Sequence, residues 1–124
     1  MAKLTAESLI AKWGNHTFST GVYTGEDYQA FQRSFRIVLR SIAENAGFEL
    51  HKFLPNHYSC SAVLRHREAG KFVYVSIADV RSFRKEWYEQ VLYRTMEHCT
   101  DWHGGPNHRA ELTKLGNAIQ RLVE

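Results

Sequence analysis

The chain has 124 residues, of which 44% are hydrophobic, with only two cysteines and a formal net charge of +3. This length fits one domain, so we expect residues 1–124 to form a single unit around one core. The cysteine count argues against a disulfide-built fold, the apolar runs are too short for a transmembrane helix, and the N-terminus lacks a signal-peptide pattern. We therefore expect a cytoplasmic protein without membrane contact, whose weak positive charge permits an acidic partner but does not require one.

Two helices are predicted in the first part of the chain. Thr5 has the character of an N-cap and predicts a helix at 6–13. The segment 24–27 resembles a capping box with Asp at its fourth position, and it predicts a longer helix that ends near residue 45, before Gly47. Hydrophobic residues recur in this segment at spacings of four, three and four, as one face of a helix requires: Phe31, Phe35, Val38 and Ile42.

Three strands are predicted in the middle of the chain, at 48–54, 57–66 and 71–80. The third is the clearest, because β-branched and other residues alternate along it: Val73, Val75 and Ile77 against Phe72, Tyr74 and Ser76. Gly70 lies in the short connection before it and can adopt a positive φ. Short connections favour an antiparallel meander of three strands.

Two further helices are predicted in the last part. The first runs from about residue 84 to 98, with a helical apolar face made of Tyr88, Val91, Leu92, Thr95 and Met96. The second begins at Pro106, since proline suits the first helical position, and carries the apolar stripe Leu112, Leu115, Ala118, Ile119 and Leu122. The sequence therefore predicts an α+β fold in which a three-stranded antiparallel β-meander packs against amphipathic helices, in the order ααβββαα.

The segment 94–109 concentrates polar chemistry between the last two predicted helices. His98, Asp101, His103 and His108 carry side chains that bind zinc in other proteins. Their spacing matches no zinc finger, and the chain has no HExxH pair. We favour a capped turn without a cofactor, in which Asp101 accepts backbone hydrogen bonds and Trp102 packs on the core. A metal-dependent hydrolase or nuclease that uses these four residues is the alternative.

Basic residues form the second candidate site. Three arginines on the long predicted helix share one side of it, away from the apolar face. Arg and Lys make most contacts with phosphate groups, although a solvated charged surface would look the same. With residues of the hairpin, the later segments and the 94–109 loop, the candidate contacts to a protein or nucleic-acid partner are Arg33, Arg36, Arg40, Arg65, Arg67, Lys71, Arg81, Arg84, Arg94, Trp102, Asn107 and Arg109.

Asp79 and Arg81 close the third predicted strand, and Arg94 lies on the helix predicted after it. A structural bridge between Asp79 and an arginine is the favoured interpretation, because such ion pairs are common. The alternative is a site for a nucleotide or another small anion, formed by Arg81, Arg94 and the Gly-Gly turn at 104–105.

Five segments between about residues 48 and 107 have a distinctive sequence, at 56–63, 74–81, 87–88, 92–95 and 101–107. In these segments the chain resembles small uncharacterised accessory proteins of bacterial mobile elements and phages. The resemblance implies a protein that acts by binding, including as an anti-CRISPR-like inhibitor of host defence. We therefore expect a non-enzymatic binding protein whose target is a protein, a nucleic acid or a nucleoprotein.

Overall fold

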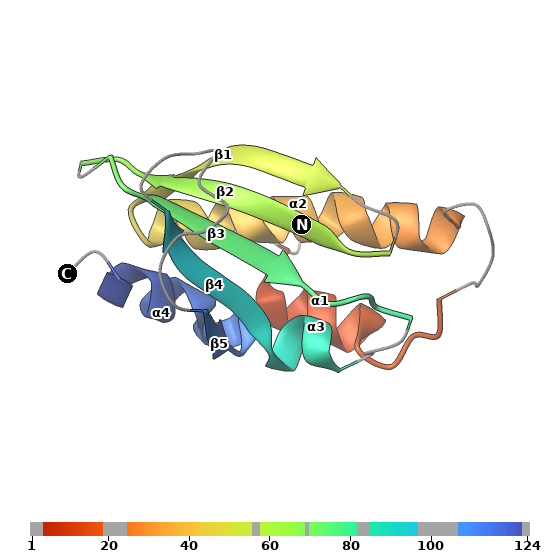
Figure 1. Ribbon diagram of the computed structural model, residues 1–124. Helices are drawn as coiled ribbons and strands as arrows, with labels where there is room; N and C mark the ends of the chain where they lie inside the picture. The colour runs from red at the N-terminus through yellow and green to blue at the C-terminus, as the bar shows by residue number, and fades with distance from the viewer. Residues whose placement is uncertain are drawn as a thin grey trace.

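The computed structural model describes residues 4–18, 25–55, 58–68, 70–81, 85–96 and 107–122. In chain order the elements are α1 (Ala6–Trp13), α2 (Glu26–Asn45), β1 (Phe48–Pro55), β2 (Cys60–His66), β3 (Phe72–Ile77), α3 (Glu86–Glu89), β4 (Val91–Met96), β5 (His108–Ala110), the 3₁₀ turn η1 (Leu112–Lys114) and α4 (Leu115–Leu122). The strands form one antiparallel sheet in the order β1-β2-β3-β4-β5. Figure 1 shows α2 running behind β1 and β2, with α1 and α4 toward the β4 end of the sheet. The α+β class predicted from the sequence is confirmed.

The first helices follow the local signals with one correction. The Thr5 side chain accepts a hydrogen bond from the Ser8 backbone, and the Ser8 hydroxyl completes a capping box, so α1 covers the predicted 6–13. α2 begins at Glu26 with Gly25 as its N-cap and no side-chain cap, so a capping box does not start this helix. It ends at Asn45, and Gly47 follows with a φ of +85°. No helix in the described segments is long and apolar enough to cross a membrane.

The first three strands form the predicted meander. β2 and β3 join through a short hairpin, in which Gly70 adopts a φ of +67° and donates its N–H to the carbonyl of His66. The register between β1 and β2 shifts between Leu50 and Lys52, which marks an irregularity in the outermost strand. The alternation predicted for β3 is present, because Val73, Val75 and Ile77 are buried while the residues between them are partly exposed.

The predicted helix at 84–98 is wrong. Only Glu86–Glu89 is helical there, and the following residues form β4, which pairs with β3 on one side and with β5 on the other. The spacing of Val91, Leu92, Thr95 and Met96 is helical, and in β4 it places Val91 and Thr95 on one face of the sheet and Leu92 and Met96 on the other. Without β4, however, β3 would be left with an open edge. Tertiary pairing therefore decides the structure of this short segment.

The last predicted helix also begins later than expected. Residues after Pro106 form β5 and η1, and the regular helix α4 starts only at Leu115. The sheet thus has five strands instead of three, and the order is ααβββαββα instead of ααβββαα. A strand of three residues is too short to show a period in sequence.

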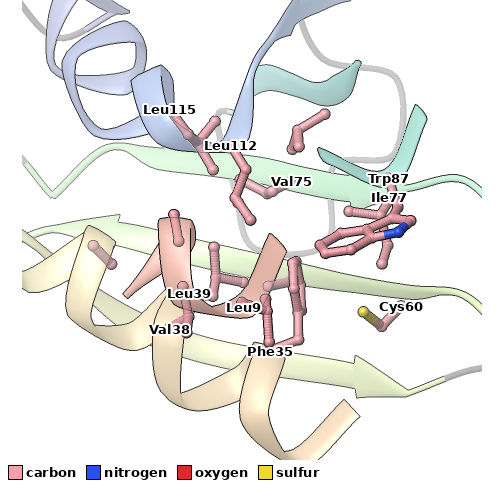
Figure 2. Close-up of a cluster of buried hydrophobic side chains, with 14 of the residues drawn as sticks. Leu9, Phe35, Val38, Leu39, Cys60, Val75, Ile77, Trp87, Leu112 and Leu115 are labelled. Atoms are coloured by element: carbon pink, nitrogen blue, oxygen red, sulfur yellow. The ribbon is translucent and has the colours of Figure 1, made fainter. Parts of the chain in front are cut away.

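The core lies between the helices and one face of the sheet. Figure 2 shows α2 placing Phe35, Val38 and Leu39 toward side chains of the strands and of η1, with Leu9 of α1 beside them. We call the other side of the sheet its outer face. It carries Ser61 and Val63 of β2, Tyr74 and Ser76 of β3, and Arg94 of β4, which the strand register places on the same side.

Candidate partner-binding surfaces

The solvent-facing side of α2 carries three arginines and one large apolar residue. Arg33, Arg36, Ile37 and Arg40 are exposed, and Ile37 has 55% of its surface accessible. These residues, which we call the α2 arginine face, lie opposite the buried residues Phe31, Phe35, Val38 and Leu39. Within the described residues no carboxylate forms an ion pair with any of the three arginines. The helix thus presents cationic groups and an aliphatic side chain to solvent on one surface.

Arg36 is held partly by packing. Its guanidinium carbon lies 5.5 Å from the ring centroid of Phe53 on β1, within the range of a cation–π contact. This contact orients one of the three arginines at the outer edge of the sheet. Ile37, which the sequence-based set of contact residues lacks, could have been found from its position between Arg33 and Arg40 on the polar side of the helical period.

The β2–β3 hairpin contributes a smaller basic group. Arg65 forms an exposed ion pair of 3.2 Å with Glu49, so its charge is partly compensated. Arg67 and Lys71 are exposed at the turn. The Arg67 backbone donates a hydrogen bond of 3.1 Å to the carbonyl of Gly47, which ties the hairpin to the turn after α2.

Arg81 forms a structural bridge. Two nitrogens of its guanidinium lie 3.2 and 2.9 Å from the carboxylate oxygens of Asp79, whose Oδ1 also accepts the Arg81 backbone N–H at 2.8 Å. The hydrogen bonds to Asp79 raise the pKa of the Arg81 guanidinium. The same group lies 4.2 Å from the ring centroid of Tyr58. This pair holds the chain after β3. The bridge favoured from the sequence joined the strand end to the following helix, and the Asp79–Arg81 pair does not span those two elements.

Arg94 does not lie on a helix, contrary to the sequence-based prediction. It is the fourth residue of β4, it pairs with Tyr74 across the sheet, and only 7% of its surface is exposed. Arg81 packs on Tyr58 whereas Arg94 packs on Tyr74, and the Gly-Gly turn at 104–105 lies outside the described residues. The predicted contact residues that the structure describes therefore do not gather on one surface.

Three of the four residues of the predicted metal site, His98, Asp101 and His103, lie outside the described residues. The candidate contacts Arg84 and Trp102 also lie outside them. His108 is described, and its ring stacks on Tyr93 with centroids 5.3 Å apart. In the segments that the structure describes, no group of three or more His, Cys, Asp or Glu side chains could hold a metal ion. Asn107, just before β5, and Arg109, on β5, are exposed.

A groove that the sequence did not indicate lies between α1, the second half of α2, and η1 with α4. Its volume is about 310 Å³. The floor is apolar and includes Val38, Ile42 and Leu112, while the rim carries neutral polar side chains such as Asn45 and Asn117. Such a groove depends on how three distant segments pack, which no local pattern reports.

Cys60 is the one described cysteine, and its environment makes it inert. It is fully buried, and burial raises the pKa of its thiol to about 12. Because the thiolate is the nucleophile, a thiol that stays protonated at neutral pH gives no covalent catalysis. Burial likewise raises the pKa of the neighbouring Tyr28, whose hydroxyl donates to the carbonyl of Ser59. Cys60 and Tyr28 are therefore residues of the buried core.

No family model, curated protein or solved structure matches this chain.

Proposed function

We propose that this protein is a non-enzymatic binding protein that attaches to an acidic protein partner through its α2 arginine face. The observation that carries this is the arrangement of Arg33, Arg36 and Arg40 around the exposed Ile37. Such a surface offers charge complementarity to carboxylates and an apolar contact at its centre. Interfaces of this kind obtain most of their affinity from a few central residues.

The arginines destabilise the isolated helix, which supports a role in binding. Arg36 lies three residues after Arg33 and four before Arg40, so like charges face each other along the helix surface. Each such pair costs about 0.2–0.5 kcal/mol in a helix. A partner with carboxylates opposite the three guanidinium groups would turn this repulsion into attraction and would steer association.

Ile37 favours a protein partner over a nucleic acid. Bases bind to proteins by stacking on aromatic rings, and phosphates need only cationic donors. The aliphatic side chain at the centre of the α2 arginine face can neither stack on a base nor bind a phosphate. It can pack against an apolar residue of an acidic peptide or helix. The large hydrophobic residues that are exposed in the described segments, Leu4 and Ile37, are both aliphatic.

The test compares capture by four forms of the protein. Wild type, Ile37→Ser, the double variant Arg36→Glu/Arg40→Glu, and the control Arg121→Glu, which reverses an exposed charge on α4, are immobilised and exposed to bacterial lysate. A partner captured by wild type and the control, but not by the two α2 variants, is purified and its Kd is measured. We expect at least a tenfold loss of affinity with Ile37→Ser and a Kd that rises with salt.

Nucleic acid is tested separately with labelled single- and double-stranded DNA across a salt series. Binding with a steep salt dependence that is lost in the arginine variant and kept in Ile37→Ser would contradict an acidic protein partner. Equal capture of the same proteins by all four forms would remove the α2 arginine face as the binding surface.

We also propose that the protein comes from a phage or a mobile element, and this part of the proposal rests on the sequence resemblance alone. In that setting the partner is a cytoplasmic host-defence protein, and the chain inhibits it. Expression in cells with CRISPR immunity should raise the plating efficiency of a targeted phage, and Ile37→Ser should abolish the rise. If plating is unchanged while the purified partner still binds, the inhibitor role is wrong and the binding surface stands.

A further inference from the structure

Arg94 is a buried cation on the outer face of the sheet. Its residue is 93% buried, and its Nη1 atom is buried without a hydrogen-bond partner. The guanidinium carbon lies 5.0 Å from the ring centroid of Tyr74, the residue opposite it on β3. Within the described residues Arg94 has no carboxylate partner.

An orphaned donor on a charged group is more costly than one on a neutral group. The other side-chain donor of this kind in the described residues is Nε1 of Trp13, which carries no charge. A buried guanidinium needs both hydrogen bonds and a counter-charge, because removing a cation from water costs several kcal/mol. The cation–π contact with Tyr74 compensates only part of this cost. An anion bound at the guanidinium would supply the rest.

A chain of hydroxyl groups on the same face as Arg94 supplies one further donor. The Tyr74 hydroxyl donates to Oγ of Ser61 at 2.9 Å, and the Ser61 hydroxyl donates to Oγ of Ser76 at 3.2 Å. In this chain the last hydroxyl, on Ser76, keeps its own proton for another acceptor. Ser61 is itself 92% buried, so the chain is a fixed feature of the sheet rather than a solvated surface.

The described pairing between β4 and β5 covers Val91, Leu92 and Tyr93 and stops one residue before Arg94. Within the described residues, Arg94 therefore pairs with β3 alone.

We propose that the outer face of the sheet binds an oxyanion, a phosphate or carboxylate group of a small ligand, with Arg94 as its main donor and the Ser76 hydroxyl as a further donor. The planar guanidinium suits both groups, because two of its N–H donors match two oxygens of the same anion. The site lies on the opposite side of the sheet from the α2 arginine face and is independent of it.

The test follows the side-chain Nε–Hε signals of arginine in ¹⁵N-labelled protein, together with the melting temperature. Inorganic phosphate and acetate are titrated at constant ionic strength, with chloride as the control anion. We expect a saturable shift of the Arg94 signal and a rise of the melting temperature with at least one oxyanion, and neither with chloride. A response to phosphate alone assigns a phosphorylated ligand, and a response to acetate assigns a carboxylate.

The variants locate the effect. Arg94→Gln should abolish the saturable rise, whereas Arg65→Gln, which removes an ion-paired arginine from the same sheet face, should retain it. If Arg94→Gln does not fold, Tyr74→Phe keeps the ring, removes the hydroxyl and should weaken binding severalfold. Ile37→Ser should leave anion binding unchanged, which separates this site from the proposed function. An Arg94 signal that follows chloride and the oxyanions equally would overturn the proposal, as would a rise that persists in Arg94→Gln.

Discussion

Tyr58 holds the junction between β1, β2 and α2 in a conformation that its own backbone disfavours. Its φ is +59°, in the left-handed region that costs a residue with a side chain roughly 1–2 kcal/mol. Its ring is fully buried, and its hydroxyl accepts the backbone N–H of Gly25 at 2.9 Å. Because Gly25 has no side chain with which to cap α2, Tyr58 acts from a distance on the start of that helix.

Tyr58→Phe should therefore destabilise the protein by about 1–2 kcal/mol, because the Gly25 N–H loses its acceptor in a buried region. Urea unfolding measures this change. The matched control is Tyr88→Phe, since the hydroxyl of Tyr88 makes no hydrogen bond within the described residues, and it should change stability by less than about 0.5 kcal/mol. Equal effects of the two substitutions would show that the Tyr58 hydroxyl does not support α2.

At the scale of the element, one side of α2 packs in the core and the other side faces solvent. Phe35 is 1% exposed and packs against the sheet, whereas Ile37, two residues later, is 55% exposed. Both are large hydrophobic residues, so composition does not distinguish them, and only their place in the helical period does. This contrast gives a direct test of which apolar residue stabilises the fold and which is available to a partner.

Phe35→Ala should lower the free energy of unfolding by about 3–5 kcal/mol, because it leaves a cavity in the core. Ile37→Ala should change it by no more than about 0.5 kcal/mol. Thermal and urea unfolding of both variants measure the difference. A large loss with Ile37→Ala would mean that Ile37 supports the fold, and the α2 arginine face would then lose its apolar centre.

The elements that sequence patterns predict here are those with strong local signals. Thr5 caps α1, Gly47 ends α2 and Gly70 shapes the hairpin, and each acts through its own backbone or side chain. β4 was predicted as a helix because its apolar residues have helical spacing, and pairing with β3 outweighs that local pattern. The same mistake moved Arg94 from a strand interior to a helix surface. A burial that depends on sheet pairing leaves no local trace in the sequence.

At the scale of the molecule, the core contains two acidic groups that must stay neutral. Burial raises the pKa of the Cys60 thiol from its usual 9.0 to about 12, and it also raises the pKa of the Tyr28 hydroxyl. In the unfolded chain both groups ionise at ordinary values. Above about pH 9 the unfolded state therefore binds fewer protons than the folded state, so stability falls as the pH rises.

Urea unfolding between about pH 8 and pH 10.5 should show this loss, with a limit of about 1.4 kcal/mol per pH unit for each group that ionises. Cys60→Ala should flatten the part of the curve that begins near pH 9, where only the thiol contributes. Tyr28 should contribute above about pH 10 in both proteins. A curve that is flat in wild type, or equally steep in Cys60→Ala, would contradict the buried neutral thiol.

The final segment of the chain completes a core that the first segments begin. Leu112 and Leu115 pack in the same cluster as Leu9, Val38 and Leu39, and the groove between α1, α2 and α4 marks where the first and last described helices meet. During synthesis, the apolar sides of α1 and α2 have no cover until η1 and α4 have left the ribosome. This core can therefore close only after the chain has emerged as far as α4.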